Sequence, residues 1–393
     1  MSQTIKLKKG FDINLVGKAE KKTTEVNQPE TFALKPTDFV GVSRPKLVVK
    51  EGDNVKAGSP IFFERNVEDV FYTSPVSGEI VEIKRGDKRK VLEVKILADK
   101  EVEFENFSKH TTSDLANLSK EDVLEQLKKS GAWVNIIQRP YGCIANPADT
   151  PKSIFISAFD SSPLAPDYAY ILQGQEQNFQ AGIDVFKKLT SGIVHLNIDG
   201  KAEVSQLFSQ TQNVQLNNIT GPHPAGNVGV QIHHIDPVAK GDTVWTVNPV
   251  GVAQIGKLFL EGVYDTSRLI AITGSQVKDR SYVKTFAGAD IGKLLIDNLE
   301  GDNQRFISGN VLTGEGVGEN GYLGYFHNQI TVIPEGNEEE FFGWIKPSTN
   351  KLSYHKAFGL LSFLNSKKEF NVDTNTHGEH RNFVITGSFE NVL

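Results

Sequence analysis

The chain has 393 residues, more than one hydrophobic core usually holds, so we expect two to four domains. Its charged fraction of 23% is typical of a globular protein, and its formal net charge of -6 argues against nucleic acid as a partner. The single cysteine, Cys143, excludes an internal disulfide and an iron–sulfur cluster held by four thiolates. The N-terminus lacks an apolar stretch of signal-peptide length, and no apolar run approaches the roughly 18 residues that cross a bilayer. We therefore expect a cytoplasmic protein that meets a membrane only through a partner.

Residues 1–105 predict a β domain, since they are rich in Val, Ile, Phe and Thr with turn residues at intervals. The turns at Gly52-Asp53, Gly58 and Pro75–Gly78 separate short apolar runs, as in the barrel-sandwich fold of lipoyl and biotinyl carriers, although an ordinary pair of hairpins would look the same. Where those carriers hold an acylated lysine, this chain has Arg65. A guanidinium stays protonated and is a poor nucleophile, so we expect a structural module without a covalent arm.

Residues 110–250 predict a Rossmann-like parallel α/β domain. Ser119 as N-cap and Gly131 as a stop delimit a first helix. The elements expected after it are a strand at 154–159, a helix at 177–189, a strand at 193–198, a helix at 202–209 and a strand at 214–219. This alternation is typical of a parallel sheet covered by helices.

Residues 251–337 predict a β-grasp (SLBB-like) domain, and a helix that opens at residues 248–251 runs into it as far as Leu260. The expected strands are 269–273, 282–286, 305–307 and 329–333, with a helix at 291–299. Residues 338–393 form an irregular segment in which Phe341, Phe342 and Trp344 need a partner surface. We expect this segment, which stops at Leu393 without an obvious capping element, to be shortened.

The turn after the first strand of the α/β domain does not resemble a nucleotide-binding loop. It runs from Ser157 to Pro163 without glycine, Asp160 would repel a phosphate, and Pro163 has no N–H to donate. We expect no nucleotide at this turn, which leaves Asp160 and Ser161 as capping residues.

Neither pair of neighbouring histidines predicts a metal site. His377 and His380 have no cysteine and no second acidic cluster nearby, so we interpret them as solvated loop residues. His233 and His234, if they lie in a strand, point to opposite faces and cannot chelate one ion.

One basic cluster stands out on this acidic chain. Two interpretations remain open: a solvated hairpin tip, or a docking patch for an acidic partner surface or anionic lipid headgroups. The cluster consists of Lys84, Arg85, Lys88, Arg89 and Lys90.

Several segments spread along the chain resemble one family. They are 8–13 (KKGFDI), 52–58 with 74–78, 138–141 (QRPY), 157–168 and 221–226 (GPHPAG). They resemble the A subunit of the sodium-translocating NADH:quinone reductases, a family similar to the C subunit of Rnf complexes and to the flavin-bearing, NADH-binding subunit of respiratory complex I. Those two relatives carry a glycine-rich flavin loop, an acidic turn and cluster-binding cysteines. Here Trp133–Pro140 contains no glycine, Ser162 replaces the second acid of the turn, and the cysteines are missing.

The resemblance implies a peripheral subunit on the cytoplasmic face of the bacterial inner membrane. Its complex would couple NADH oxidation and quinone reduction to sodium export, with NADH, flavins, iron–sulfur centres and Na+ bound by other subunits. This chain would bind no cofactor or metal, would not be catalytic alone, and would assemble with the remaining subunits of the complex, including the membrane-embedded B subunit. The alternatives are a flavin- and NADH-binding dehydrogenase module of the complex I type and a carrier with an acyl arm.

The resemblance also implies quinone as a ligand close to the B subunit. A quinone needs an apolar slot with proton donors, and the segments 32–39 and 133–141 mix aromatic with polar residues. Any domain interface would show the same mixture. The residues that we place near the quinone are Phe32, Lys35, Asp38, Phe39, Trp133, Gln138, Arg139 and Tyr141.

Overall fold

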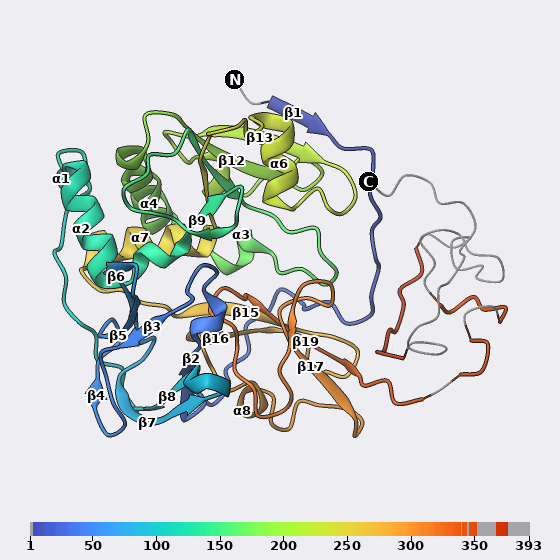
Figure 1. The fold of residues 1–393 in the computed structure, drawn as a ribbon. Helices are drawn as coiled ribbons and strands as arrows, with labels where there is room; N and C mark the ends of the chain where they lie inside the picture. The colour runs from blue at the N-terminus through green and yellow to red at the C-terminus, as the bar shows by residue number, and fades with distance from the viewer. Residues whose placement is uncertain (1–2, 339, 344–345, 352–366, 376–393) are drawn as a thin grey trace.

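The computed structural model describes residues 3–338, 340–343, 346–351 and 367–375. Figure 1 shows two halves: the helices gather around one large sheet in the upper half, and three smaller sheets fill the lower half. The hydrophobic core is continuous from one half to the other, because buried side chains of both halves belong to one cluster.

The N-terminal β part consists of two small sheets. One has the order β2 (Thr31–Leu34), β8 (Val91–Ala98), β7 (Gly78–Arg85) and β4 (Asn54–Val55); the other has the order β3 (Pro45–Leu47), β5 (Pro60–Glu64) and β6 (Val67–Thr73). Alternate residues of the strands point inward, so Ile61, Ile80 and Val94 are fully buried. Arg65 is exposed at the turn between β5 and β6. The expected barrel-sandwich layout is therefore present.

The large sheet has seven strands in the order β1 (Gln3–Lys6), β13 (Gln215–Thr220), β12 (Ile193–Asp199), β11 (Ser153–Ser157), β14 (Val244–Val247), β9 (Ile136–Arg139) and β10 (Cys143–Ile144). The first five strands are parallel, and β9 and β10 are antiparallel to their neighbours. Gln3–Lys6, which we assigned to the β domain of residues 1–105, pairs with β13 of the large sheet. The edge of β13 offers backbone groups to this segment, and Leu7 packs against Ile219 just beyond it.

Seven α-helices accompany this sheet in the described part of the chain: α1 (Thr112–Leu115), α2 (Lys120–Ser130), α3 (Tyr168–Ile171), α4 (Glu176–Leu189), α5 (Gln206–Ser209), α6 (Val228–Ile235) and α7 (Pro249–Glu261). Ser119 caps α2 together with Asp122, and Gly131 ends it in the left-handed conformation, as predicted. Glycines let α4 and α7 touch: a Cβ on Gly256 would lie 1.7 Å from the Asn178 carbonyl oxygen. Helix α6 was not predicted. His233 and His234 lie in its last turn, so the strand considered for them was wrong.

The third part is a five-stranded sheet in the order β16 (Tyr282–Thr285), β15 (Arg268–Thr273), β19 (Gln329–Pro334), β17 (Gln304–Ser308) and β18 (Glu315–Gly316), with helix α8 (Ile291–Leu294). Helix α8 is shorter than the predicted helix at 291–299, since Asp297 takes a positive φ of 66°. The described part of the chain also contains three 3-10 turns: η1 (Pro36–Asp38), η2 (Asp87–Arg89) and η3 (Ala132–Asn135).

The described residues after 338 form no helix or strand of more than one bridged residue. Among them, Phe370 packs on Leu15 and Leu164, whereas Phe341 and Phe342 are exposed. Trp344, His377 and His380 lie outside the described residues.

Candidate functional site

A cavity of about 730 Å³ lies where β11 and β14 end. The chain leaves β11 toward β12 on one side and returns to β14 on the other, so the cavity occupies the point where the strand order reverses. Open α/β sheets commonly bind ligands at this place. Its lining includes Ser157 and Val247, the last residues of these two strands, and Phe159 and Asn248 just beyond them.

Three of the segments that carried the family resemblance meet beside this cavity. A Cβ on Gly226 would lie 2.3 Å from the Ser161 nitrogen, and one on Gly10 would lie 2.1 Å from the His223 carbonyl oxygen. The Asp12 carboxylate accepts the His223 backbone N–H at 2.8 Å. Only glycine permits these approaches. The N-terminal arm, the turn after β11 and the loop before α6 are thereby locked together.

The turn after β11 holds itself in place by short hydrogen bonds. The Asp160 carboxylate accepts the Ser162 N–H at 2.7 Å, and the Ser161 hydroxyl accepts the Gly226 N–H at 2.7 Å. The same hydroxyl contacts Nδ1 of His223 at 3.0 Å.

A second cavity, of about 810 Å³, lies on the other side of this turn, and Asp12, Asp199, Glu203 and Glu369 are among its lining residues.

Of the eight residues that we placed near a quinone, Asp38 and Arg139 line the 730 Å³ cavity. Val40 accepts a hydrogen bond from the Ile144 N–H at 3.0 Å, so the segment after η1 lies against the β9–β10 hairpin. This contact places the two predicted regions, 32–39 and 133–141, side by side along the same wall of the 730 Å³ cavity.

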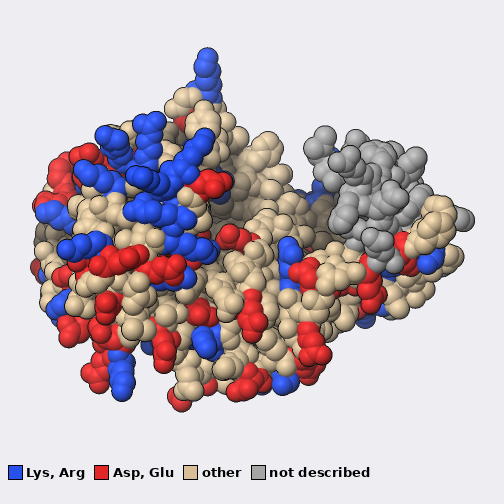
Figure 2. Space-filling view, turned by 60° about the horizontal axis from the view of Figure 1, so that its bottom comes forward, with Lys and Arg blue, Asp and Glu red and all other residues tan. Residues whose placement is uncertain are grey.

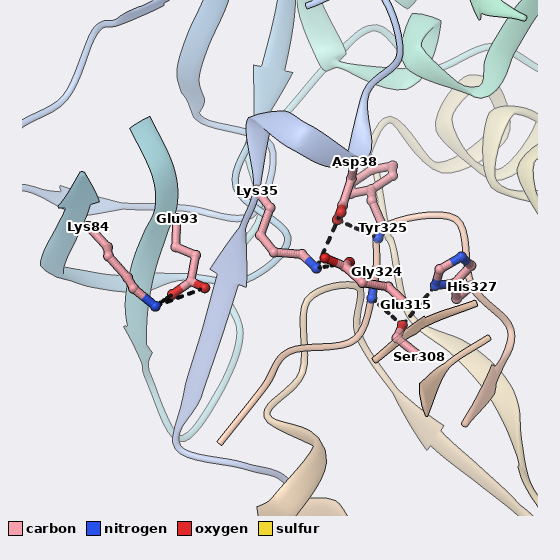
Figure 3. Close-up of polar contacts among 9 residues, drawn as sticks. All are labelled: Lys35, Asp38, Lys84, Glu93, Ser308, Glu315, Gly324, Tyr325 and His327. Atoms are coloured by element: carbon pink, nitrogen blue, oxygen red, sulfur yellow. Dashed lines mark hydrogen bonds and ion pairs between the residues drawn. The ribbon is translucent and has the colours of Figure 1, made fainter. Parts of the chain in front are cut away.

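Asp38 and Lys35 are the buried members of an ionic cluster between the N-terminal β part and the third sheet (Figure 3). Asp38 lies 3.3 Å from the Lys35 ammonium and accepts the Tyr325 N–H at 2.9 Å, while Lys35 also contacts Glu315 at 3.0 Å. Burial raises the pKa of Asp38 although Lys35 opposes the shift. Burial would lower the pKa of Lys35, but the carboxylates of Asp38 and Glu315 outweigh it and raise that pKa. Figure 3 also shows His327, whose Nδ1 lies 2.7 Å from the Ser308 hydroxyl and whose pKa burial lowers to about 4.

Arg139, unlike Asp38, has no charged partner among the described residues. Its guanidinium makes no hydrogen bond or ion pair with another described residue, and its Nε is buried. Burial is the one cause that lowers the pKa of Arg139. Asn135 and Ile137, four and two positions earlier, line the same cavity, so this side of β9 faces it.

The other residues of the predicted quinone set do not line the cavity. Phe32 and Phe39 are buried in the core, and the Trp133 indole donates to the Ala145 carbonyl at 2.7 Å. Gln138 donates to Asp149 at 2.9 Å on the opposite face of β9, and Tyr141 is 85% exposed at the hairpin tip.

The prediction missed several residues that the cavity brings together. Ser162 is 9% exposed, and its hydroxyl has no hydrogen-bond partner among the described residues. The Tyr168 hydroxyl accepts a hydrogen bond from the Asn248 side-chain amide at 3.0 Å, and Asn248 also caps α7. The capping signature of Asn248-Pro249 was visible in the sequence; the exposure of Ser162 to a cavity was not.

The basic cluster lies on the β7–η2–β8 hairpin, where Lys84, Arg85, Lys88, Arg89 and Lys90 are all exposed. Figure 2, which brings the lower face of Figure 1 forward, shows a concentration of basic side chains on one side of this face. Lys84 pairs with Glu93 at 3.4 Å, and Arg85 donates to the Arg89 carbonyl at 3.2 Å. Lys88 and Arg89 have positive φ angles of 54° and 60°.

Within the described residues, no three His, Cys, Asp or Glu side chains are grouped to hold a metal ion. In the same part of the chain, every helix is too short or too polar to cross a membrane.

Three family models match consecutive parts of the chain. They describe the NqrA N-terminal barrel-sandwich hybrid domain at residues 5–99, the NqrA second alpha/beta domain at 118–264 and the NQRA C-terminal domain at 269–318. A solved structure, an NAD+-reducing [NiFe]-hydrogenase, matches with a TM-score of 0.37 at 11% identity over 60% of this chain and 52% of that chain, too weak a likeness to support an argument.

Curated relatives match over nearly the whole chain. The A subunit of the Na(+)-translocating NADH-quinone reductase of Serratia proteamaculans is 37% identical over 395 residues, which cover 99% of this chain and 86% of the relative. That of Alcanivorax borkumensis is 38% identical over 392 residues with the same coverage. The chain belongs to the NqrA family, the A subunits of the Na(+)-translocating NADH-quinone reductases.

Proposed function

We propose that the chain is a peripheral, cofactor-free subunit of a Na(+)-translocating NADH-quinone reductase, docked at the cytoplasmic face of the inner membrane on the membrane-embedded B subunit. The family supports membership of an oxidoreductase complex. The exposed basic hairpin supports docking, since it offers several unburied positive charges on an acidic chain.

We further propose that quinone reaches the 730 Å³ cavity at the ends of β11 and β14. The convergence of Asp38 and Arg139 on this cavity carries the proposal. Its walls also include Val40, Ile137 and Phe326, which can cover a quinone ring. Arg139 can donate hydrogen bonds to a ring oxygen, and Asp38, whose pKa is raised by burial, can hold a proton close to that ring.

The α/β domain is proposed to be a Rossmann-like scaffold that has lost its nucleotide site. The order β13-β12-β11-β14 supports the scaffold, because it repeats the 3-2-1-4 order of dinucleotide-binding domains. The loss is supported by the turn after β11, where Asp160 and Pro163 line the neighbouring cavity in place of glycines.

Crosslinking with a photoreactive quinone in the assembled complex tests the quinone proposal. We expect label on peptides that contain Val40, Arg139 or Phe326, read by peptide mass, and competition by unlabelled quinone. Label confined to other subunits would refute a quinone site on this chain.

A further inference from the structure

The 730 Å³ cavity contains polar groups that lack partners, and all of them favour negative charge. Arg139 and the Ser162 hydroxyl line it, and neither the guanidinium nor this hydroxyl bonds to another described residue. The Ser162 side chain is more than nine-tenths buried, so bulk water does not compensate for the missing bond. Buried donors without acceptors are costly, and each is satisfied by a ligand that brings an acceptor oxygen.

The start of α6 faces the same cavity. Gly226, Asn227, Val228, Gly229 and Val230 are lining residues, and the Asn227 side chain makes no capping hydrogen bond. The first N–H groups of a helix have no partner within the helix and carry partial positive charge. The close approach of Gly226 to Ser161 places this helix start beside the turn that ends in Ser162.

A second buried guanidinium, that of Arg268, acts electrostatically on the cavity residue Tyr168. Arg268 is 7% exposed, donates to the Tyr325 carbonyl at 2.5 Å and to Asn328 at 3.4 Å, and has no carboxylate partner among the described residues. Asn328 lies 3.5 Å from Asn248, which holds the cavity residue Tyr168. A buried positive charge without a counter-ion is destabilising, so Arg268 also favours a negative charge nearby.

Two acidic residues also line this cavity. Asp38 is paired with Lys35. Asp160 accepts the Ser162 N–H, but a hydrogen bond does not cancel its negative charge, so Asp160 opposes an anion close to Ser162 and the net attraction must come from Arg139 and the start of α6. Burial is the one cause of the lowered pKa of Arg139.

We propose that this cavity binds an aromatic ring that bears a negatively charged oxygen, held by Arg139, the Ser162 hydroxyl and the start of α6. The ligand class is a deprotonated hydroxyquinone or the anionic reduced form of a quinone. The inference rests on the proposed quinone site and adds selectivity for charge, which a purely apolar slot would not have.

Paired ligands of one ring system test the inference on the purified chain. At pH 7.5 the hydroxyl of 2-hydroxy-1,4-naphthoquinone is ionised, whereas 2-methoxy-1,4-naphthoquinone is neutral and of similar size. By isothermal titration calorimetry we expect the anion to bind about tenfold more tightly, since charged hydrogen bonds favour it. Arg139→Gln should abolish this preference, because it weakens binding of the anion about tenfold and of the neutral ligand less, since the glutamine amide still donates to a neutral ring oxygen; Arg139→Lys should retain part of the preference.

Control variants separate this effect from general damage. Arg65→Gln removes an exposed guanidinium that does not line the cavity, at the turn between β5 and β6, and should change neither affinity. If Arg139→Gln fails to fold, Ser162→Ala provides the second test, with an expected threefold or so weaker binding of the anion alone.

Equal affinities for the two ligands, or an equal loss of affinity for both in Arg139→Gln, would overturn the charge selectivity but would not contradict the proposed quinone site. Failure of both ligands to bind the chain would overturn the selectivity and the quinone site together.

Discussion

Gly226 lies directly against Ser161, so that a Cβ added to the glycine would come within 2.3 Å of the serine nitrogen. This contact joins the turn after β11 to the start of α6, and both segments line the candidate cavity.

Gly226→Ala should therefore displace this turn and destabilise the protein by about 2 kcal/mol, because a backbone neighbour cannot yield as a side chain can. The free energy of unfolding in urea measures the effect. Gly229→Ala is the matched control on the same helix start, where nothing lies within 4 Å of the added Cβ, and it should be neutral or slightly stabilising. Equal stability of the two variants would argue against the locked turn.

Lys35→Met should destabilise the protein by about 3 kcal/mol, since it leaves the buried Asp38 without its counter-ion. The Lys35 side chain is 7% exposed, whereas Lys84, paired with Glu93 in the same view (Figure 3), is 49% exposed. Lys84→Met is thus the surface control and should cost less than about 1 kcal/mol. Similar losses in both variants would show that the Lys35 pair is no more important than a surface pair.

Stability should fall as the pH is lowered from 6.5 toward 4, in part because of His195. Burial lowers the pKa of His195 to about 4, although Asp236 opposes the shift, and its ring stacks on Phe155 at 4.4 Å. The unfolded chain binds the proton first, so this contribution is complete above pH 6.5 and is reduced by about 2 kcal/mol at pH 5.

His195→Gln keeps an acceptor for the Asn217 amide but does not titrate. This variant should reduce the difference in unfolding free energy between pH 7.5 and pH 5 by about 2 kcal/mol, the contribution assigned to His195. The same substitution at the exposed His234 shows whether loss of any histidine has this effect. An unchanged pH dependence in His195→Gln would exclude His195 as the cause.

Reversal of the basic hairpin should weaken assembly. The triple variant Lys88→Glu, Arg89→Glu and Lys90→Glu should co-purify less with the membrane subunits while its unfolding curve stays within about 1 kcal/mol of the parent. A control with the same change in net charge reverses the exposed Lys8, Lys201 and Lys240. Unchanged co-purification of the hairpin variant would remove its proposed docking role.

Local sequence patterns determined most elements of this protein. Ser119 and Gly131 delimit α2 because a side-chain cap and a residue able to adopt positive φ act on their immediate neighbours. The strands β11, β12 and β13 were also predicted, since a short apolar run between helices already indicates a buried parallel strand. The five segments that carried the family resemblance likewise needed no structure.

Long-range packing decided the rest. β1 joins the large sheet because the edge of β13 is open to it, and nothing within Gln3–Lys6 encodes that partner. Asp38 and Arg139 share a cavity because the Val40 carbonyl accepts a hydrogen bond from the β9–β10 hairpin. Trp133 and Gln138 belong to the same predicted region, but their side chains do not line this cavity. Which face of a strand meets a cavity, and which buried donor stays unpaired, depends on backbone segments far apart in the chain, and only the tertiary structure brings them together.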